Sequence, residues 1–550
     1  MPSGLARASA LLASGTLVSR MLGFISGVVL AQTLGSVGAG ANTFALANQL
    51  PNNIYAIIAG GLLAAVFVPA IVRAGLHDDG GQRFINRLVT IGIVVFIAAA
   101  VIATLAAPAL VNLYTLSADG GFSDADRALA VAFAYWCLPQ VLFYALYSLL
   151  GEVLNARGVF GPFTWAPVLN NVVAIIGLIA FTIVFGAGAG RSDAELWTPT
   201  MIALLAGSAS LGVAAQALVL CLFWRRAGLR YRPDFHWRGV GLGAAGKAAA
   251  WTFGMILVTQ LAGIVQTNVA SLAAGPDSND PSLAVLRFTW LIFMLPHSIA
   301  AVSIATAYFT RMSTHARDNN LDEVRNDLST SLLTIGLITV FAAVALIVLA
   351  FPFSRVFVAA SPTSDVYTQV LGMAPVLIAF LIGLVPFSML HVLRLTFYAL
   401  EDTKTPFLIT VFQAVLFVAG ALLCALLPVQ YIAAGLAAVT TVAGTAQTAL
   451  AAILLHGRLH FAAAGLLTAR HAVFAAAALI AGGVGVFIAW LLGSYSRGGW
   501  ALSSPFSAAL AMTIAGVVMA VVYFAALLLA RNPQALAFVA PLARRLRGAR

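Results

Sequence analysis

Long apolar segments separated by short polar turns make up most of the 550-residue chain. A helix that crosses the hydrocarbon core of a bilayer needs about 20 mainly apolar residues. Fourteen segments meet that requirement, and they lie near residues 10–34, 43–72, 86–113, 129–152, 163–187, 200–224, 244–272, 283–310, 328–352, 367–393, 405–428, 431–455, 471–494 and 505–530. The pattern predicts an all-α polytopic membrane protein with about 14 transmembrane helices.

Composition excludes a soluble globular protein. Hydrophobic residues make up 61% of the chain and charged residues 9%, against about 45–50% and 25% in an ordinary soluble domain. The first apolar segment contains Arg20 and is longer than the apolar core of about 7–15 residues in a cleaved signal. We therefore interpret it as the first spanning helix.

The basic residues are distributed unevenly between the two sides of the predicted membrane. If the N-terminus is inside, 23 of the 29 Lys and Arg residues lie in inside segments and four lie outside. Positive charge marks the cytoplasmic side, so both termini are expected there. This asymmetry explains the net charge of +11 as a topology signal with affinity for anionic lipid headgroups, and no nucleic-acid partner is expected.

Three landmarks recur at an offset of 243–245 residues. They are Pro51 and Pro296, Ala156 and Ala399, and Pro162 and Pro406. Similar halves are typical of transporters that bind substrate between the halves near the bilayer midplane. The repeat predicts two parallel six-helix lobes, with the division 1–228 (N-terminal lobe), 229–246 (basic cytoplasmic linker), 247–456 (C-terminal lobe), 457–530 (two C-terminal helices) and 531–550 (basic cytoplasmic tail).

Two arginines fall inside predicted spans. Arg20 lies about ten residues into the first span, where an arginine costs at least ~2.5–3.5 kcal/mol and usually faces a cavity or a partner. A guanidinium there would suit an anionic substrate, because it can bind a phosphate with two parallel hydrogen bonds. The alternative is a structural arginine capped by a neighbouring helix. Arg287 lies near the outer end of the eighth span, where it either lines the same cavity or snorkels to the interface.

Amides, prolines and glycines complete the candidate site. Asn42, Asn48 and Asn52 cluster around Pro51 in the second span, and further amides lie in the fifth and seventh spans. Buried amides need partners, which either a wet cavity or a neighbouring helix supplies. Helix bending is expected at Pro51 and Pro296, with bending or close packing at Gly60 and Gly61.

No motif indicates an enzyme. The sequence shows no phosphate loop and no Ser-His-Asp grouping. The three cysteines all lie in apolar segments and do not form a motif with a recognisable spacing, which favours neither a disulfide framework nor a metal site. No acidic residue lies deep in a span, so a carboxylate for proton coupling or for binding cationic drugs is not evident. We expect no cofactor.

Several stretches resemble the MurJ/MviN lipid II flippases of the multidrug/oligosaccharidyl-lipid/polysaccharide exporter superfamily. They are Ser19-Arg20-Met21-Leu22-Gly23-Phe24, Ala47-Asn48-Gln49-Leu50-Pro51-Asn52, Leu295-Pro296-His297-Ser298 and the turn from Arg394 through Tyr398, Asp402 and Thr405 to Pro406. The resemblance covers about residues 10–530 and is greatest to actinobacterial members. It implies fourteen helices in two lobes.

The resemblance also implies a function and a site. Family members move an undecaprenyl-pyrophosphate-linked peptidoglycan precursor from the inner to the outer leaflet, and cavity arginines bind the pyrophosphate. Arg20 matches one of these arginines, with Ser19 beside it. The other charged family positions fall at Ser26 and Asn42 and near Ala56 and Leu291; Arg287 is one helical turn from Leu291.

Three functions therefore remain open from the sequence. The first is a lipid II flippase that works by alternating access, with cell-wall synthesis and division proteins as possible partners. The second is a flippase for another polyprenyl-linked glycan or a small-molecule antiporter of the same superfamily. The third is a membrane scaffold for cell-wall assembly that does not transport.

Overall fold

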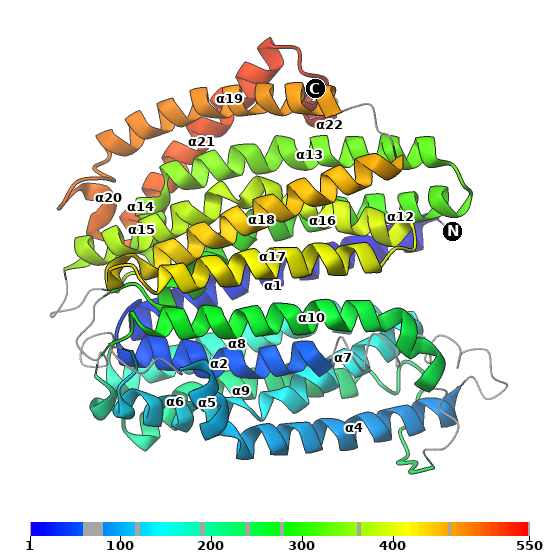
Figure 1. The fold of residues 1–550 in the computed structure, drawn as a ribbon, viewed down its shortest axis with the longest axis vertical. Helices are drawn as coiled ribbons and strands as arrows, with labels where there is room; N and C mark the ends of the chain where they lie inside the picture. Colours follow the sequence, from blue (N-terminus) through cyan, green and yellow to red (C-terminus); the bar gives the residue numbers. More distant parts are fainter. Residues whose placement is uncertain are drawn as a thin grey trace. The chain divides into compact units, whose positions relative to one another are not determined.

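The computed structural model describes the backbone of residues 2–58, 81–115, 121–187, 193–236, 242–275, 280–359, 365–459 and 464–547. Every regular element in these ranges is helical (Figure 1), as the hydrophobic pattern predicts. A helix satisfies its own backbone hydrogen bonds, which is what a chain in hydrocarbon requires.

The described helices confirm the predicted spans closely. Twelve are long and apolar enough to cross a membrane, or 13 if a pair bent by 40° at Gly383 counts as one span. The expected span near 43–72 is described only as far as Ile58, so Gly60 and Gly61 lie outside the described residues.

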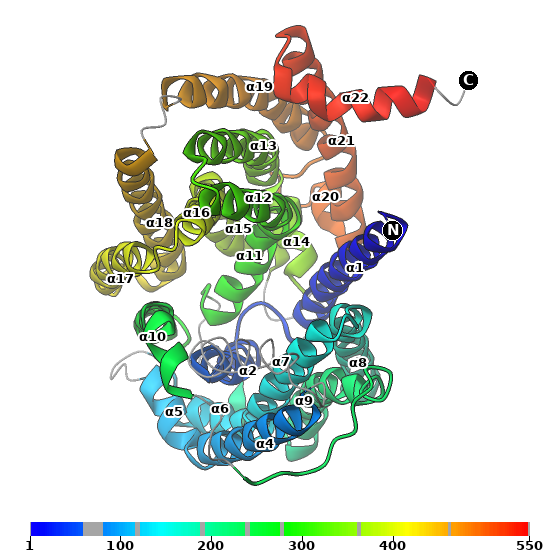
Figure 2. The ribbon, with the colours of Figure 1, turned by 90° about the vertical axis from the view of Figure 1, so that its right-hand side faces the viewer.

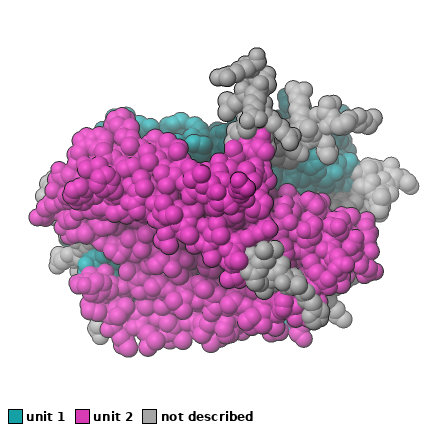
Figure 3. Space-filling model, turned by 90° about the horizontal axis from the view of Figure 1, so that it is seen from above, with its two compact units in different colours: residues 1–284, 359–363 teal, residues 285–358, 364–550 magenta. Residues whose placement is uncertain are grey.

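The contacts divide the chain into two compact units, coloured separately in Figure 3. The first comprises residues 1–284 and 359–363. Its helices are α1 (Pro2–Leu34), α2 (Ala39–Ile58), α4 (Gln82–Leu105), α5 (Ala107–Tyr114), α6 (Asp124–Cys137), α7 (Gln140–Ala156), α8 (Gly161–Phe185), α9 (Pro199–Cys221) and α10 (Leu242–Ser271), with a short 3-10 turn, Ala194–Leu196.

The second unit comprises residues 285–358 and 364–550. Its helices are α11 (Leu283–Pro296), α12 (Val302–Arg317), α13 (Leu321–Val348), α14 (Ala350–Phe357), α15 (Val366–Ile382), α16 (Leu384–Ala399), α17 (Lys404–Cys424), α18 (Val429–Leu459), α19 (Ala464–Leu491), α20 (Trp500–Ser503), α21 (Pro505–Leu529) and α22 (Pro533–Arg547). A π-helical segment, η3 (His297–Ala301), joins α11 to α12.

Helix α10 packs with the first unit, where it contacts α2 and α5. The boundary between the units therefore falls at residue 284, whereas the repeat assigns α10 to the second lobe and predicts a division at residues 229–246. The units are defined by which helices touch one another, whereas the lobes are defined by the sequence repeat. The division into lobes is therefore not tested by the contacts and stays a prediction.

Within the first unit, helix α8 packs against both α1 and α9 (Figure 2). Small residues allow the close approach of α8 and α9. A Cβ atom on Gly212 would lie 2.9 Å from the backbone oxygen of Asn170, and one on Gly177 would overlap the side chain of Ser208. Stripes of small residues are a common basis of helix association in membranes.

Helix α13 is the centre of the second unit and packs against α12, α16 and α19. The fully buried Tyr523 on α21 joins this core. Its hydroxyl donates a hydrogen bond of 2.7 Å to the backbone oxygen of Leu337, and its ring stacks on Phe341 with centroids 5.0 Å apart. The polar tip of this aromatic side chain is therefore satisfied inside an apolar core.

Candidate functional site

Arg20 lies in the apolar stretch Ser14–Leu34 of α1, as the sequence predicts, and its side chain is half-buried. Its Nε atom is buried and has no hydrogen-bond partner among the described residues. An unpaired polar group in an apolar setting costs free energy. A ligand that accepts a hydrogen bond from this guanidinium would remove that cost.

A neighbouring amide holds α1 in place. Asn171 of α8 donates a hydrogen bond from Nδ2 to the backbone oxygen of Ser19, at 2.9 Å. Gly23, one turn further along, faces the same amide, since a Cβ atom there would be 3.7 Å from Asn171 Nδ2. Asn171 therefore joins α1 to α8 through the backbone of Ser19, the residue before Arg20.

The asparagines of α2 have different surroundings. Asn42 is buried, and its Oδ1 accepts a hydrogen bond of 3.0 Å from the backbone N–H of Ala284. Asn48 is half-buried and its Oδ1 lies 3.5 Å from Gln140 Nε2, whereas Asn52 is exposed. Asn42 has a short buried hydrogen bond, whereas Asn48 has only a long contact and Asn52 is exposed, so Asn48 and Asn52 are better placed to contact a ligand.

No hydrogen bond among the described residues joins Arg20 to these asparagines. Pro51 is buried within α2, and the helix continues past it to Ile58. A proline inside a helix removes one backbone hydrogen bond, so bending at Pro51 stays a prediction.

Arg287 and Pro296 lie on α11, in the second unit. Arg287 is half-buried. Pro296 ends α11 and is followed by the π-helical segment η3, whose first residue, His297, is buried. Proline removes a backbone donor, and π-helical turns occur often at functional sites; bending at this irregular turn stays a prediction.

Helix α16 extends further than the sequence suggests. The span expected to end near residue 393 continues to Ala399, so Arg394 and Tyr398 lie in the helix and both are half-buried. Arg394 was expected in the inside loop. Its Nε atom is buried without a hydrogen-bond partner among the described residues, which makes it a second uncommitted guanidinium in an apolar helix.

The remaining motif residues form a group of hydrogen bonds and one ion pair that holds the α16–α17 turn against α18; we call this group the lock. Asp402 Oδ1 accepts a hydrogen bond of 2.9 Å from the backbone N–H of Thr405, and Asp402 Oδ2 lies 2.5 Å from Arg458 Nη1. Arg458, near the end of α18, also donates to Thr405 Oγ1 at 3.1 Å. Pro406 is buried in the first turn of α17. These contacts connect the turn to α18.

We expect Asp402→Asn to weaken this lock and to change its pH dependence. Burial alone would raise the pKa of Asp402, but the hydrogen bonds from Thr405 and the ion pair with Arg458 outweigh it and lower the pKa. A carboxyl with a lowered folded-state pKa stabilises the protein above its unfolded pKa of about 3.9, and that stability disappears as the pH falls through the folded value.

The measurement is thermal unfolding in detergent between pH 7 and pH 3. At pH 7 the variant should lose about 1–2 kcal/mol, the combined range for a helix cap and a partly exposed ion pair. The difference from the unchanged protein should shrink below pH 4. A difference independent of pH would show that the ionised form of Asp402 contributes nothing.

Sequence reasoning missed three polar residues that the fold brings into contacts. Gln140 is buried and donates to Ser210 Oγ at 2.8 Å. His391 of α16 lies with its ring 5.7 Å from that of His297, and Arg458 holds Asp402. Each of these polar residues is visible in the sequence, but its partner lies on another element of the fold, so the contact could not be predicted.

Sequence comparison finds relatives of this chain among lipid II flippases. The sequence model of the family described as "Lipid II flippase MurJ" matches residues 30–510. A "Probable lipid II flippase MurJ" of Haemophilus influenzae is 28% identical over 413 residues, covering 71% of this chain and 75% of that protein. The protein of the same description from Rhizobium meliloti is 28% identical over 401 residues, covering 71% and 70%.

Solved structures share the architecture. A structure described as "Lipid II flippase MurJ, inward closed conformation" has a TM-score of 0.70 at 18% identity, covering 94% of this chain and 100% of that one. An inward-facing multidrug resistance MATE family transporter of the MOP superfamily has a TM-score of 0.62 at 17% identity, covering 80% and 94%. Since the family match spans most of the sequence, this multi-pass membrane protein belongs to the lipid II flippase MurJ family.

Proposed function

We propose that this protein moves lipid II, the undecaprenyl-pyrophosphate-linked peptidoglycan precursor, from the inner to the outer leaflet by alternating access. The observation that carries the proposal is the family match across residues 30–510. The uncommitted guanidinium of Arg20 in a membrane-length helix supports it, because a charged side chain there is costly unless it serves a site.

In this mechanism Arg20 holds the pyrophosphate. Guanidinium and phosphate oxygens form short, charge-assisted hydrogen bonds in a two-pronged geometry. Arg287 is proposed as a second cation for the same group, while Asn48 and Asn52 contact the sugars. Bending at Pro51 and Pro296 would allow the helices to change between inward and outward access.

The orientation belongs to the proposal as well. Both termini are placed in the cytoplasm because 23 of the 29 Lys and Arg residues then lie on the inside. The protein is proposed to act as a transporter rather than an enzyme and to need no cofactor. Anionic lipids and cell-wall synthesis or division proteins are its proposed partners.

The test is complementation of cells depleted of their own lipid II flippase. The intact chain, expressed at a verified level in the membrane, should restore growth and the appearance of lipid II in the outer leaflet. Failure by a well-expressed chain would contradict the proposal, provided that a family member from a comparably distant organism rescues the same cells.

One alternative keeps a specific observation in its favour. By the resemblance described above, four positions that are charged in the family fall at Ser26 and Asn42 and near Ala56 and Leu291 of this chain. A flippase for another polyprenyl-linked glycan, or a scaffold that does not transport, would not need those charges. Purified protein in vesicles, assayed with lipid II and with a second polyprenyl-linked glycan, would separate transport of either substrate from no transport.

A further inference from the structure

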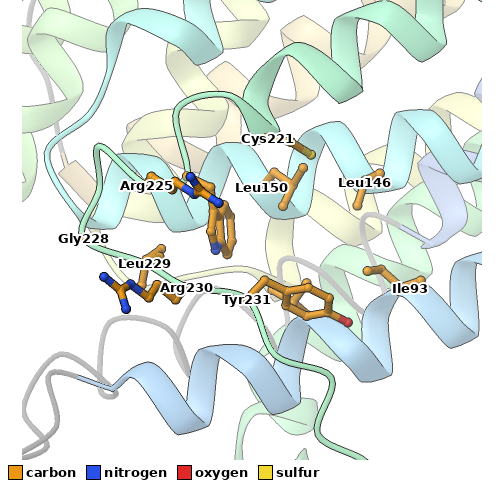
Figure 4. Close-up of a pocket in the computed structure, with 11 residues that line it drawn as sticks. Ile93, Leu146, Leu150, Cys221, Arg225, Gly228, Leu229, Arg230 and Tyr231 are labelled. Carbon is orange, nitrogen blue, oxygen red and sulfur yellow. The ribbon is translucent and has the colours of Figure 1, made fainter.

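A cavity of about 980 Å³ opens in the first unit between α4, α7 and the segment that follows α9. We call residues 222–236 the strap. Figure 4 shows the strap crossing near α4 and α7, with the cavity's lining side chains between them. The cavity is at the upper end of the roughly 300–1,000 Å³ typical of small-molecule sites, and the flippase proposal above does not use it.

The lining of the cavity is amphipathic. Val89, Ile93, Leu146 and Leu150 supply apolar walls from α4 and α7. Arg225 and Arg230 line the cavity from the strap, and in Figure 4 they lie at the end opposite Ile93 and Leu146. A ligand that fills this space must therefore combine an apolar part with a group that suits two cations.

Within the part of the chain that the structure describes, no acidic group neutralises the two arginines. Both side chains are exposed, and neither has an ion-pair partner among the described residues. The single acid of the strap, Asp234, lies 3.6 Å from Arg87 Nε and 2.8 Å from His236 Nδ1. Its charge is already engaged by these groups.

A buried donor faces the same cavity without an acceptor. Trp224 lines the cavity, its side chain is only 7% exposed, and its Nε1 atom is buried with no hydrogen-bond partner among the described residues. A buried indole N–H normally finds a partner. A ligand oxygen in the cavity would satisfy it, and this observation is independent of the two arginines.

Hydrogen bonds to α4 fix the strap over the cavity. Gln82 donates to the backbone oxygen of Arg230 at 3.0 Å and accepts from its backbone N–H at 3.2 Å. Further along, the Tyr231 hydroxyl lies 3.1 Å from Thr90 Oγ1, which also accepts from the Asp234 backbone N–H at 3.0 Å. The cavity is therefore bounded by a positioned segment, and its polar end is preorganised.

We propose that this cavity binds one anionic phospholipid. The phosphate lies between Arg225 and Arg230, an acyl chain lies along the apolar walls, and Trp224 Nε1 donates to an ester or phosphate oxygen. A free phosphate would use the arginines but leave the apolar walls uncovered, so a lipid suits the whole lining better. Binding would hold the strap against α4 and link the stability of the first unit to the anionic lipid content of the membrane.

Native mass spectrometry of the full-length protein in detergent tests the proposal. The protein is titrated with phosphatidylglycerol, with phosphatidylcholine and with inorganic phosphate. We expect one phosphatidylglycerol to bind at least about tenfold more tightly than phosphatidylcholine, the factor that corresponds to ~1.4 kcal/mol. Equal binding of the two lipids, or binding of inorganic phosphate that displaces the lipid, would overturn the proposal.

The chain supplies a matched pair of variants. Arg225→Gln with Arg230→Gln should weaken phosphatidylglycerol binding about tenfold or more. Arg226→Gln with Arg232→Gln removes the same charge from the same strap without touching the cavity lining, because Arg226 lies over the Phe223 ring and Arg232 is not a lining residue. That pair should leave binding unchanged, and equal losses in both pairs would show nonspecific charge attraction.

A second measurement needs no variant. Cys221 is exposed and lines the cavity, while the other two cysteines, Cys137 and Cys424, are buried. Bound phosphatidylglycerol should slow alkylation of Cys221 by a maleimide, and phosphatidylcholine should slow it less. Alkylation at the same rate with and without phosphatidylglycerol would contradict occupancy of the cavity.

Discussion

Arg20→Ala is expected to abolish rescue of flippase-depleted cells while leaving the protein in the membrane. The guanidinium is half-buried in α1 and its Nε atom has no partner among the described residues, so its removal should cost the fold little. Loss of a charge-assisted contact of about 1.5–3 kcal/mol should weaken binding of a pyrophosphate lipid about 10- to 100-fold.

The measurement compares growth and outer-leaflet lipid II at equal membrane expression. Met21→Ala is the matched control, because Met21 is the next residue of α1 and its side chain is 55% exposed. Arg20→Lys should retain part of the activity, since lysine keeps the charge but lacks the planar fork. Full rescue by Arg20→Ala would remove Arg20 from the substrate site without changing the family assignment.

Arg355→Met is expected to produce the largest loss of stability. Arg355 on α14 is 4% exposed, and its guanidinium donates to three backbone oxygens: Leu502 at 2.8 Å, Val358 at 2.7 Å and Ser503 at 3.5 Å. The variant would leave these buried acceptors without donors. Two short hydrogen bonds from a charged group, at about 1.5–3 kcal/mol each, suggest a loss of about 3–5 kcal/mol.

Thermal unfolding of the purified protein in detergent tests this expectation. Arg497→Gln is the control, because Arg497 forms an exposed ion pair with Asp365 in the same region, with Nη2 2.6 Å from Oδ2. Exposed pairs contribute little, so this control should unfold at nearly the temperature of the unchanged protein. Equal midpoints for Arg355→Met and the unchanged protein would show that the three carbonyls find other donors.

The pattern of apolar residues predicted the helices well because the requirement is local. A spanning segment must be apolar over about 20 residues and must satisfy its own backbone hydrogen bonds. Both properties can be read from consecutive residues, so the described helices fall where the spans were expected. Reading only consecutive residues also explains why the predicted end of the tenth span, near residue 393, is too early. Arg394 is a charged residue that resembles the start of a loop, but α16 continues to Ala399.

The partners of polar side chains could not be read in this way. Asn42 and Asn171 are both amides within predicted spans, yet Asn42 accepts from the backbone of Ala284 and Asn171 donates to that of Ser19. Each partner lies more than 100 residues away in the chain. Only the packing of α8 against α1 and of α2 within the first unit decides which amide is structural.

The sequence by itself determined that this is an all-helical membrane protein, where its spans lie, and that Arg20 is an isolated charge within one of them. The tertiary structure decided which polar groups are committed to partners and which are not. It also placed Arg225 and Arg230, which in the sequence are only two of the many basic residues, in the lining of a cavity. The physical reason is that the apolar character of a spanning helix is a property of consecutive residues. Side-chain hydrogen bonds and cavities, in contrast, need groups from several helices.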